Sequence, residues 1–165
     1  MSTVHIHLLL NHVPVIGAVI GLALLVMALA RRSDELARVT FWLYAVLGAA
    51  SIVVYVTGEP AEDAVENLAG VSKAIIEQHE EAALVATIAM GAAGALALLA
   101  TLVFRRKAIP RPVVGGSFVM ALLITGLMGY TANLGGQIRH TEIGAGAVPS
   151  GETSPARSRV EKDED

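Results

Sequence analysis

The chain has 165 residues, of which 54% are hydrophobic and 16% charged, with a net charge of −3 and a mean hydropathy of +0.61. This composition is too apolar for an average soluble domain and favours a lipid bilayer as the solvent. Cysteine is absent, which excludes disulfides, thiolate-ligated zinc, iron–sulfur clusters and covalently attached c-type haem. Any metal or cofactor must therefore be held by other side chains, without a covalent thioether link.

Four stretches free of Asp, Glu, Lys and Arg predict four membrane helices, because about 20 apolar residues suffice to cross the hydrocarbon core. They cover residues 7–30, 39–57, 82–104 and 113–134. No basic segment or small-residue cleavage site surrounds the first stretch, so we expect a retained helix and not a removed signal peptide. The third helix is expected to begin at Lys73, capped by Ser72, and to continue unbroken into its span. The fold class predicted for residues 1–143 is an all-α, integral membrane four-helix bundle.

Three segments outside the spans have recognisable compositions. Residues 58–80 form an acidic loop, in which Pro60 is expected to open a short helix through Leu68. Gly135 and Gly136 are expected to end the fourth helix and to turn residues 137–140 back over the mouth of the bundle. Residues 144–165 contain mostly Gly, Ala, Ser, Pro and charged residues, a composition typical of a disordered polar tail.

The basic residues predict the orientation of the chain, because loops rich in Lys and Arg stay on the cytoplasmic side. The loop between spans two and three has only Lys73, whereas the other two loops are strongly basic. Their cations are Arg31, Arg32 and Arg38 in the first loop, and Arg105, Arg106, Lys107 and Arg111 in the third. We therefore expect a multi-pass inner-membrane protein with both termini and the acidic loop on the periplasmic side.

This topology places all five histidines at the outer rim: His5, His7, His12, His79 and His140. A b-type haem needs two neutral imidazoles from different helices, and His12 with His79 meets that need, with His7 or His140 as substitutes. His5 and His12 are seven residues apart and share a helix face with Ile16 and Val19. The alternative is that these histidines are hydrated or hydrogen-bonded at the membrane interface.

Other side chains could support such a cofactor. Asn11, Asn133 and Gln137 are candidate partners for the second nitrogen of a ligating histidine. Arg139 could pair with a haem propionate or with the loop carboxylates, and its alternative is a surface arginine. His79 shares a stripe with small residues, which is either a cofactor wall or a packing seam. The stripe consists of Ala82, Ala83, Ala86, Met90 and Ala93.

The motifs of hydrolases, transferases and nucleotide-binding enzymes are absent, and nothing indicates nucleic-acid binding, so we expect an electron carrier or a subunit more than a stand-alone enzyme. In the leading hypothesis, electron transfer involves a periplasmic or membrane redox partner. A second hypothesis is a non-catalytic membrane subunit or anchor whose acidic loop (Glu62, Asp63 and Glu66) docks a periplasmic partner. A third is a copper or zinc site on His12 and His79.

Small-residue seams leave the oligomeric state open between a homo-oligomer and a subunit of a larger complex. Gly126 with Gly129 and Tyr130 forms one such seam, and Gly91 with Ala95 forms another. Either seam could face a sister helix of the same chain or another copy.

Several of these residues form a family-like pattern: His7, His12 and Pro14 in the first helix, His79 at the start of the third, and Gly135, Gly136 and Ile138 after the fourth span. The pattern resembles a domain-of-unknown-function family of bacterial four-helix membrane proteins with His-Pro-x-x-x-His-x-Pro, a later histidine and a terminal Gly-Gly-x-Leu. The resemblance covers residues 5–143. It departs at Leu8, where the family has proline, and residues 58–62 look like a subgroup feature. It implies b-type haem binding, with His7, His12 and His79 as candidate ligands.

Overall fold

The computed structural model describes residues 2–68 and 70–139, and these residues form helices and connecting segments but no strand. The helices are α1 (Thr3–Leu10), α2 (His12–Arg31), α3 (Asp34–Val56), α4 (Gly58–Asp63), α5 (Lys73–Val103) and α6 (Arg111–Arg139). Four helical stretches are long and apolar enough to cross a membrane: Thr3–Arg31, Asp34–Val56, Lys73–Val103 and Arg111–Ile138. The predicted all-α architecture with four candidate spans is confirmed. His140 and the predicted tail at 144–165 lie outside the described residues.

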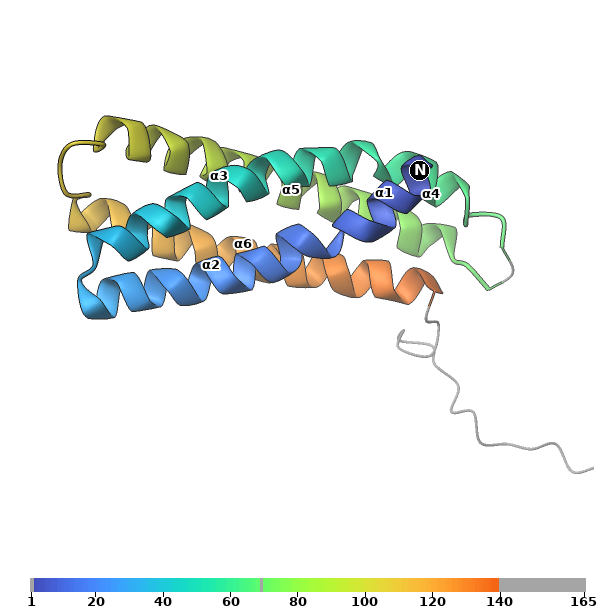
Figure 1. Ribbon diagram of the computed structural model, residues 1–165. Helices are drawn as coiled ribbons and strands as arrows, with labels where there is room; N and C mark the ends of the chain where they lie inside the picture. Colours follow the sequence, from blue (N-terminus) through green and yellow to red (C-terminus); the bar gives the residue numbers. More distant parts are fainter. Residues whose placement is uncertain (1, 69, 140–165) are drawn as a thin grey trace, which may run out of the picture.

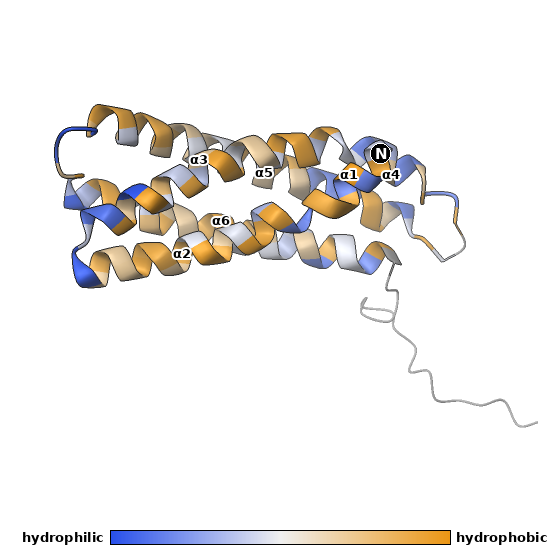
Figure 2. Cartoon of the chain, in the orientation of Figure 1, coloured by the Kyte–Doolittle hydropathy of each residue, from blue (hydrophilic) through white to orange (hydrophobic). Residues whose placement is uncertain are grey.

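The four long helices form an elongated bundle in which α2 packs against α3 and α6, and α5 packs against the same two helices (Figure 1). The α2–α3 and α5–α6 loops meet at one end, which we call the loop end. The other end contains α1, α4, the start of α5 and the end of α6, and we call it the histidine end. Figure 2 shows hydrophobic residues along the length of the long helices and hydrophilic residues gathered towards both ends.

The first helix is interrupted at Asn11, although a single continuous helix was predicted. Pro14 lacks the N–H that would bond to the Leu10 carbonyl, and its ring crowds that turn, so the helix is weakest there. Asn11 keeps helical backbone angles, φ −58° and ψ −28°, which makes the interruption mild. The side-chain oxygen Oδ1 of Asn11 is buried without a hydrogen-bond partner among the described residues.

Two further boundaries differ from prediction. The short helix α4 begins at Gly58, not at Pro60, and ends at Asp63, well before Leu68. The predicted helix end at Gly135 and Gly136 is wrong, because α6 continues through both glycines to Arg139. The expectation for α5 is confirmed: it begins at Lys73 after Ser72 and continues unbroken, although the Ser72 side chain makes no capping bond.

A close backbone-to-backbone contact joins α3 and α5 through two glycines. A Cβ atom on Gly94 would lie 2.7 Å from the Tyr44 carbonyl oxygen, and one on Gly48 would lie 3.2 Å from the Met90 carbonyl oxygen. The two backbones therefore touch, as membrane helices do where small residues meet. Ala86, Met90 and Ala93 are buried in the same core cluster, so these members of the alanine stripe take part in helix packing.

A hydrogen-bond network fixes the loop end. Asp34, at the start of α3, accepts bonds from Arg38 Nε at 2.8 Å and from the backbone N–H of Ile109 at 2.7 Å. Arg38 also donates to the carbonyl of Phe104 at 2.8 Å and to that of Lys107. The Arg38 cation thus lies at the C-terminus of α5, where it also complements the helix dipole. This network ties the α5–α6 loop to the beginning of α3.

Candidate functional site

The ring of His7 connects α1 to the end of α3. Its Nδ1 lies 3.0 Å from the Val54 carbonyl oxygen and 3.5 Å from the Thr57 hydroxyl, and the side chain is half-buried. A carbonyl oxygen can only accept, so the bond to Val54 places the proton on Nδ1. In the neutral ring, the other nitrogen, Nε2, has the lone pair.

His79 makes the equivalent contact between α5 and α6. Its Nδ1 lies 3.0 Å from the Thr131 carbonyl oxygen, and the ring is half-buried. The same reasoning puts the proton on Nδ1 and leaves Nε2 as a base. Both histidines therefore have their tautomer set by a backbone carbonyl of the neighbouring helix.

A glycine follows each accepting carbonyl by four residues: Gly58 after Val54 (54 + 4) and Gly135 after Thr131 (131 + 4). A Cβ on Gly58 would lie 3.6 Å from His7 Cε1, and a Cβ on Gly135 would lie 3.0 Å from His79 Cε1. Each ring thus lies against one helical turn that has no side chain on that side. We call each set of histidine, carbonyl and glycine a histidine clamp.

The two clamps occupy corresponding positions in the two helical hairpins. In each hairpin, a histidine near the start of the first long helical segment bonds to a carbonyl near the end of the second. Both clamps lie at the histidine end, one joining α1 to the end of α3 and the other joining the start of α5 to the end of α6 (Figure 1). The bundle therefore brings two imidazoles to the same end, one from each hairpin, and each has its Nδ1 bonded to a backbone carbonyl.

Such histidines have the chemistry of axial or metal ligands. A ligating histidine usually donates its second ring N–H to a carbonyl or carboxylate, which fixes the ring and raises the basicity of the ligating nitrogen. His7 and His79 already make that bond. Across residues 2–68 and 70–139, no three or more His, Asp or Glu side chains are grouped so as to hold a metal ion, so a purely protein-ligated copper or zinc site has no three-ligand set there.

The other histidines are placed differently. His12 begins α2 and is exposed, as are Ile16 and Val19 on the same face. His5 is also exposed, and its Nδ1 lies 2.7 Å from the hydroxyl of Ser2, the N-cap residue of α1. His5 and His12 are therefore both exposed, and it is His7 that contacts the neighbouring helix.

Among the described residues, the side chains of Asn11, Asn133 and Gln137 make no hydrogen bond to a histidine ring. Gln137 donates to Asn133 at 2.6 Å, and this pair is exposed on α6. Arg139 is the last residue of α6, so it continues the helix and does not follow a turn. The bonds that hold His7 and His79 go to the carbonyls of Val54 and Thr131, and because every residue has a carbonyl, such partners leave no signal in the sequence. The usable signal was Gly135, four residues after the Thr131 carbonyl, which was predicted to end the helix.

Carboxylates surround the same end. Glu62 on α4 is half-buried, and burial raises its pKa above the usual value, with further contributions from the charges of Glu80, Asp63 and Glu59. Glu66 lies 3.7 Å from Lys73 Nζ and accepts a bond from Asn67. Glu66 of the acidic loop therefore makes contacts within the chain, and the negative charge of the loop lies at the histidine end.

Comparison with protein-family models, with curated proteins and with solved structures finds no match. The geometry described above is thus the basis for assigning a function.

Proposed function

We propose that this chain is a multi-pass membrane protein that binds b-type haem without covalent attachment and acts in electron transfer. His7 and His79 are the proposed axial ligands. The observation that carries the proposal is the pair of histidine clamps, which leave two Nε2 lone pairs at one end of the bundle. His7 replaces His12 as the predicted ligand from the first helical segment, because His12 is exposed and His7 is held against α3.

The hydropathy and charge of the chain support a place in the inner membrane. Four helical stretches have the length and composition of membrane spans. The loop end carries almost all of the basic residues outside the tail, so we place it in the cytoplasm and the histidine end on the periplasmic side. Electrons would then be exchanged with a partner at the outer half of the membrane.

The chain's own residues would hold and tune the cofactor. The Val54 and Thr131 carbonyls orient the two imidazoles, and the missing side chain of Gly135 lets the His79 ring lie close against α6. When bound, haem supplies a one-electron couple whose potential depends on ligand identity, hydrogen bonding and local charge. The nearby carboxylates favour the more positively charged, oxidised state.

An absorption spectrum of the detergent-purified protein from haem-replete cells tests the proposal. We expect Soret and α bands that sharpen on dithionite reduction. His7→Ala and His79→Ala should each remove the six-coordinate spectrum, whereas His12→Ala, an exposed histidine of the same segment, should leave it unchanged. A colourless preparation would contradict haem binding, and stoichiometric copper or zinc in it would favour a metal site. A spectrum lost on His12→Ala but kept on His7→Ala would contradict the assigned ligands.

The glycine of a clamp offers a second test that spares both histidines. In Gly135→Ala the new Cβ would lie 3.0 Å from His79 Cε1, so the ring must shift by a few tenths of an ångström. We expect weaker haem retention and an altered reduced spectrum. Gly129→Ala on the same helix is the matched control, because its Cβ would have no atom within 4 Å. Equal spectra for the two variants would mean that His79 does not hold the iron.

A further inference from the structure

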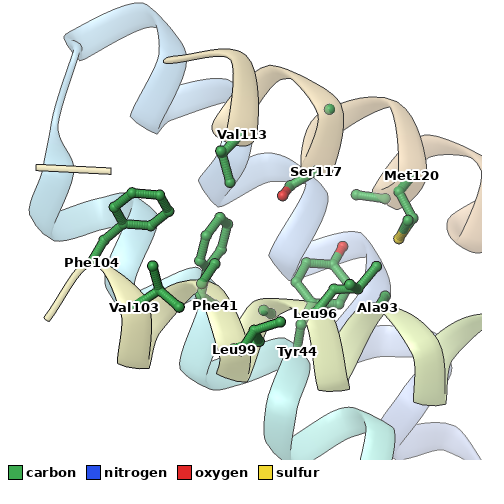
Figure 3. A pocket seen from close by; sticks show the side chains of 14 residues that line it. Phe41, Tyr44, Ala93, Leu96, Leu99, Val103, Phe104, Val113, Ser117 and Met120 are labelled. Carbon is green, nitrogen blue, oxygen red and sulfur yellow. The ribbon is translucent and has the colours of Figure 1, made fainter. Parts of the chain in front are cut away.

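A largely apolar cavity lies between α3, α5 and α6 towards the loop end, away from the histidine clamps (Figure 3). Its volume is about 380 Å³, within the range of about 300–1,000 Å³ that small-molecule sites occupy. Phe41 and Tyr44 of α3 line its inner side. The space exists because α5 and α6 face each other here through small residues: Ala93, Ala97, Ala100 and Gly116.

The cavity opens to the outside of the bundle between α5 and α6. Three of its lining residues on α5, Leu96, Leu99 and Val103, are more than half exposed, at 52%, 56% and 62%. Gly116 on α6 is also exposed, and a Cβ there would meet no atom within 4 Å. In a membrane-inserted bundle, this opening faces the hydrocarbon of the lipid. An apolar space of this kind offers water too few polar partners to hold it.

The residues at the loop end of the cavity lead directly into a cluster of cations. Phe104 and Val113 line the cavity and border the α5–α6 loop. That loop and its neighbour carry seven Lys and Arg residues against two carboxylates, 7 − 2 = +5 in formal charge. The cations are Arg31, Arg32, Arg38, Arg105, Arg106, Lys107 and Arg111, and the carboxylates are Asp34 and Glu35. Arg105, Arg106, Lys107 and Arg111 are all exposed.

The bonds of Arg38 and Asp34 keep this arrangement in place. Arg38 holds the Phe104 carbonyl, and Asp34 holds the Ile109 N–H. Arg38 and Asp34 also pair with each other, so neither is free for a ligand, whereas the exposed cations of the α5–α6 loop are directed to solvent. These bonds therefore hold the basic loop next to the rim of the cavity in the absence of a ligand.

We propose that this cavity binds one acyl chain of an anionic phospholipid whose phosphate contacts Arg105, Arg106 and Lys107. An apolar cleft beside a cluster of Arg and Lys matches the two parts of such a lipid, and basic sites between membrane helices on the cytoplasmic side bind anionic headgroups. The inference rests on membrane insertion with the loop end in the cytoplasm. It does not depend on haem.

Lipid binding to the full-length protein in a neutral detergent tests this site. Dioleoyl phosphatidylglycerol is titrated against dioleoyl phosphatidylcholine, and retained lipid is measured by native mass spectrometry. We expect phosphatidylglycerol to bind roughly tenfold or more tightly, from the cations beside the headgroup. Equal binding of the two lipids would overturn the proposal.

Two variants separate the cavity from the charge. Gly116→Leu should occupy the cavity mouth and reduce phosphatidylglycerol binding about tenfold, whereas Gly126→Leu, an exposed glycine of α6 that does not line the cavity, should bind as the wild type does. Replacement of Arg105 and Arg106 by Gln should remove the preference over phosphatidylcholine without affecting folding, because both are exposed. Wild-type binding in either Gly116→Leu or the double Gln variant would refute the site. The haem spectrum is recorded on the same samples, so failure of one proposal is distinguishable from failure of the other.

Discussion

Gly94→Ala is expected to destabilise the bundle at the contact of α3 and α5. The added Cβ would lie 2.7 Å from the Tyr44 carbonyl oxygen and 3.1 Å from Gly48 Cα, whereas ordinary contact begins at 3.4 Å. The difference at Tyr44, 3.4 − 2.7 = 0.7 Å, is the distance by which the helices must give way. Both obstacles are backbone atoms, so no side chain can rotate aside. Overpacking of this kind costs about 1–3 kcal/mol of the free energy of unfolding.

Gly91→Ala provides the reference for that magnitude. Gly91 lies on the same helix, and a Cβ there would have no atom within 4 Å. Both variants gain the same helix propensity, up to about 1 kcal/mol, so the difference between them isolates the overpacking. The free energy of unfolding is measured by titrating dodecyl sulfate into mixed micelles and following circular dichroism. Two variants that agree within about 0.5 kcal/mol would refute a backbone contact between α3 and α5.

Two further predictions concern the ends of the bundle. Burial raises the pKa of the Glu62 carboxyl above its usual 4.5, so the folded state binds the carboxyl proton more tightly than the unfolded state does. The free energy of unfolding therefore falls as the pH rises from about 4.5 through the raised pKa. Glu62→Gln should therefore unfold at a higher temperature than the wild type at pH 7 and lose this advantage near pH 4; an advantage independent of pH would contradict the raised pKa. Arg38→Gln should lower the free energy of unfolding by about 1–3 kcal/mol, because Asp34 and the carbonyls of Phe104 and Lys107 each lose a hydrogen-bond donor. Arg31→Gln, at an exposed arginine, is the control and should unfold as the wild type does in the same micelle titration.

The spans were predictable because their signal is simple. Charge-free runs of sufficient length exist only where four helices were found, and the Ser72–Lys73 boundary of α5 was also recognisable. The break at Asn11 was harder to foresee, because a proline in the first turns of a helix is often tolerated. Its effect depends on whether the preceding carbonyl finds another partner, which is a property of packing.

The inward face of the first span could not be predicted from periodicity. Its residues are apolar all round, so no polar stripe distinguishes the side that faces lipid from the side that faces other helices. The sequence therefore paired His12 with His79, and only the packing of α1 on α3 and α4 shows that His7 points inwards. Gly135 illustrates a related difficulty: glycine is common at helix ends, and its use here as a flat surface under His79 depends on another helix.

The two histidine clamps have a consequence for how the hairpins assemble. In a bilayer, apolar helices can slide past one another with little change in hydrophobic burial, so apolar packing alone specifies their vertical register weakly. Each clamp removes that freedom within its own hairpin, since a slip by one turn, about 5.4 Å, would take the Nδ1 donor away from its carbonyl and the ring away from its glycine. His7 thus helps to set the register of α1 against α3, and His79 that of α5 against α6. A ligand bound by both rings would then also fix the height of one hairpin relative to the other along the bundle axis.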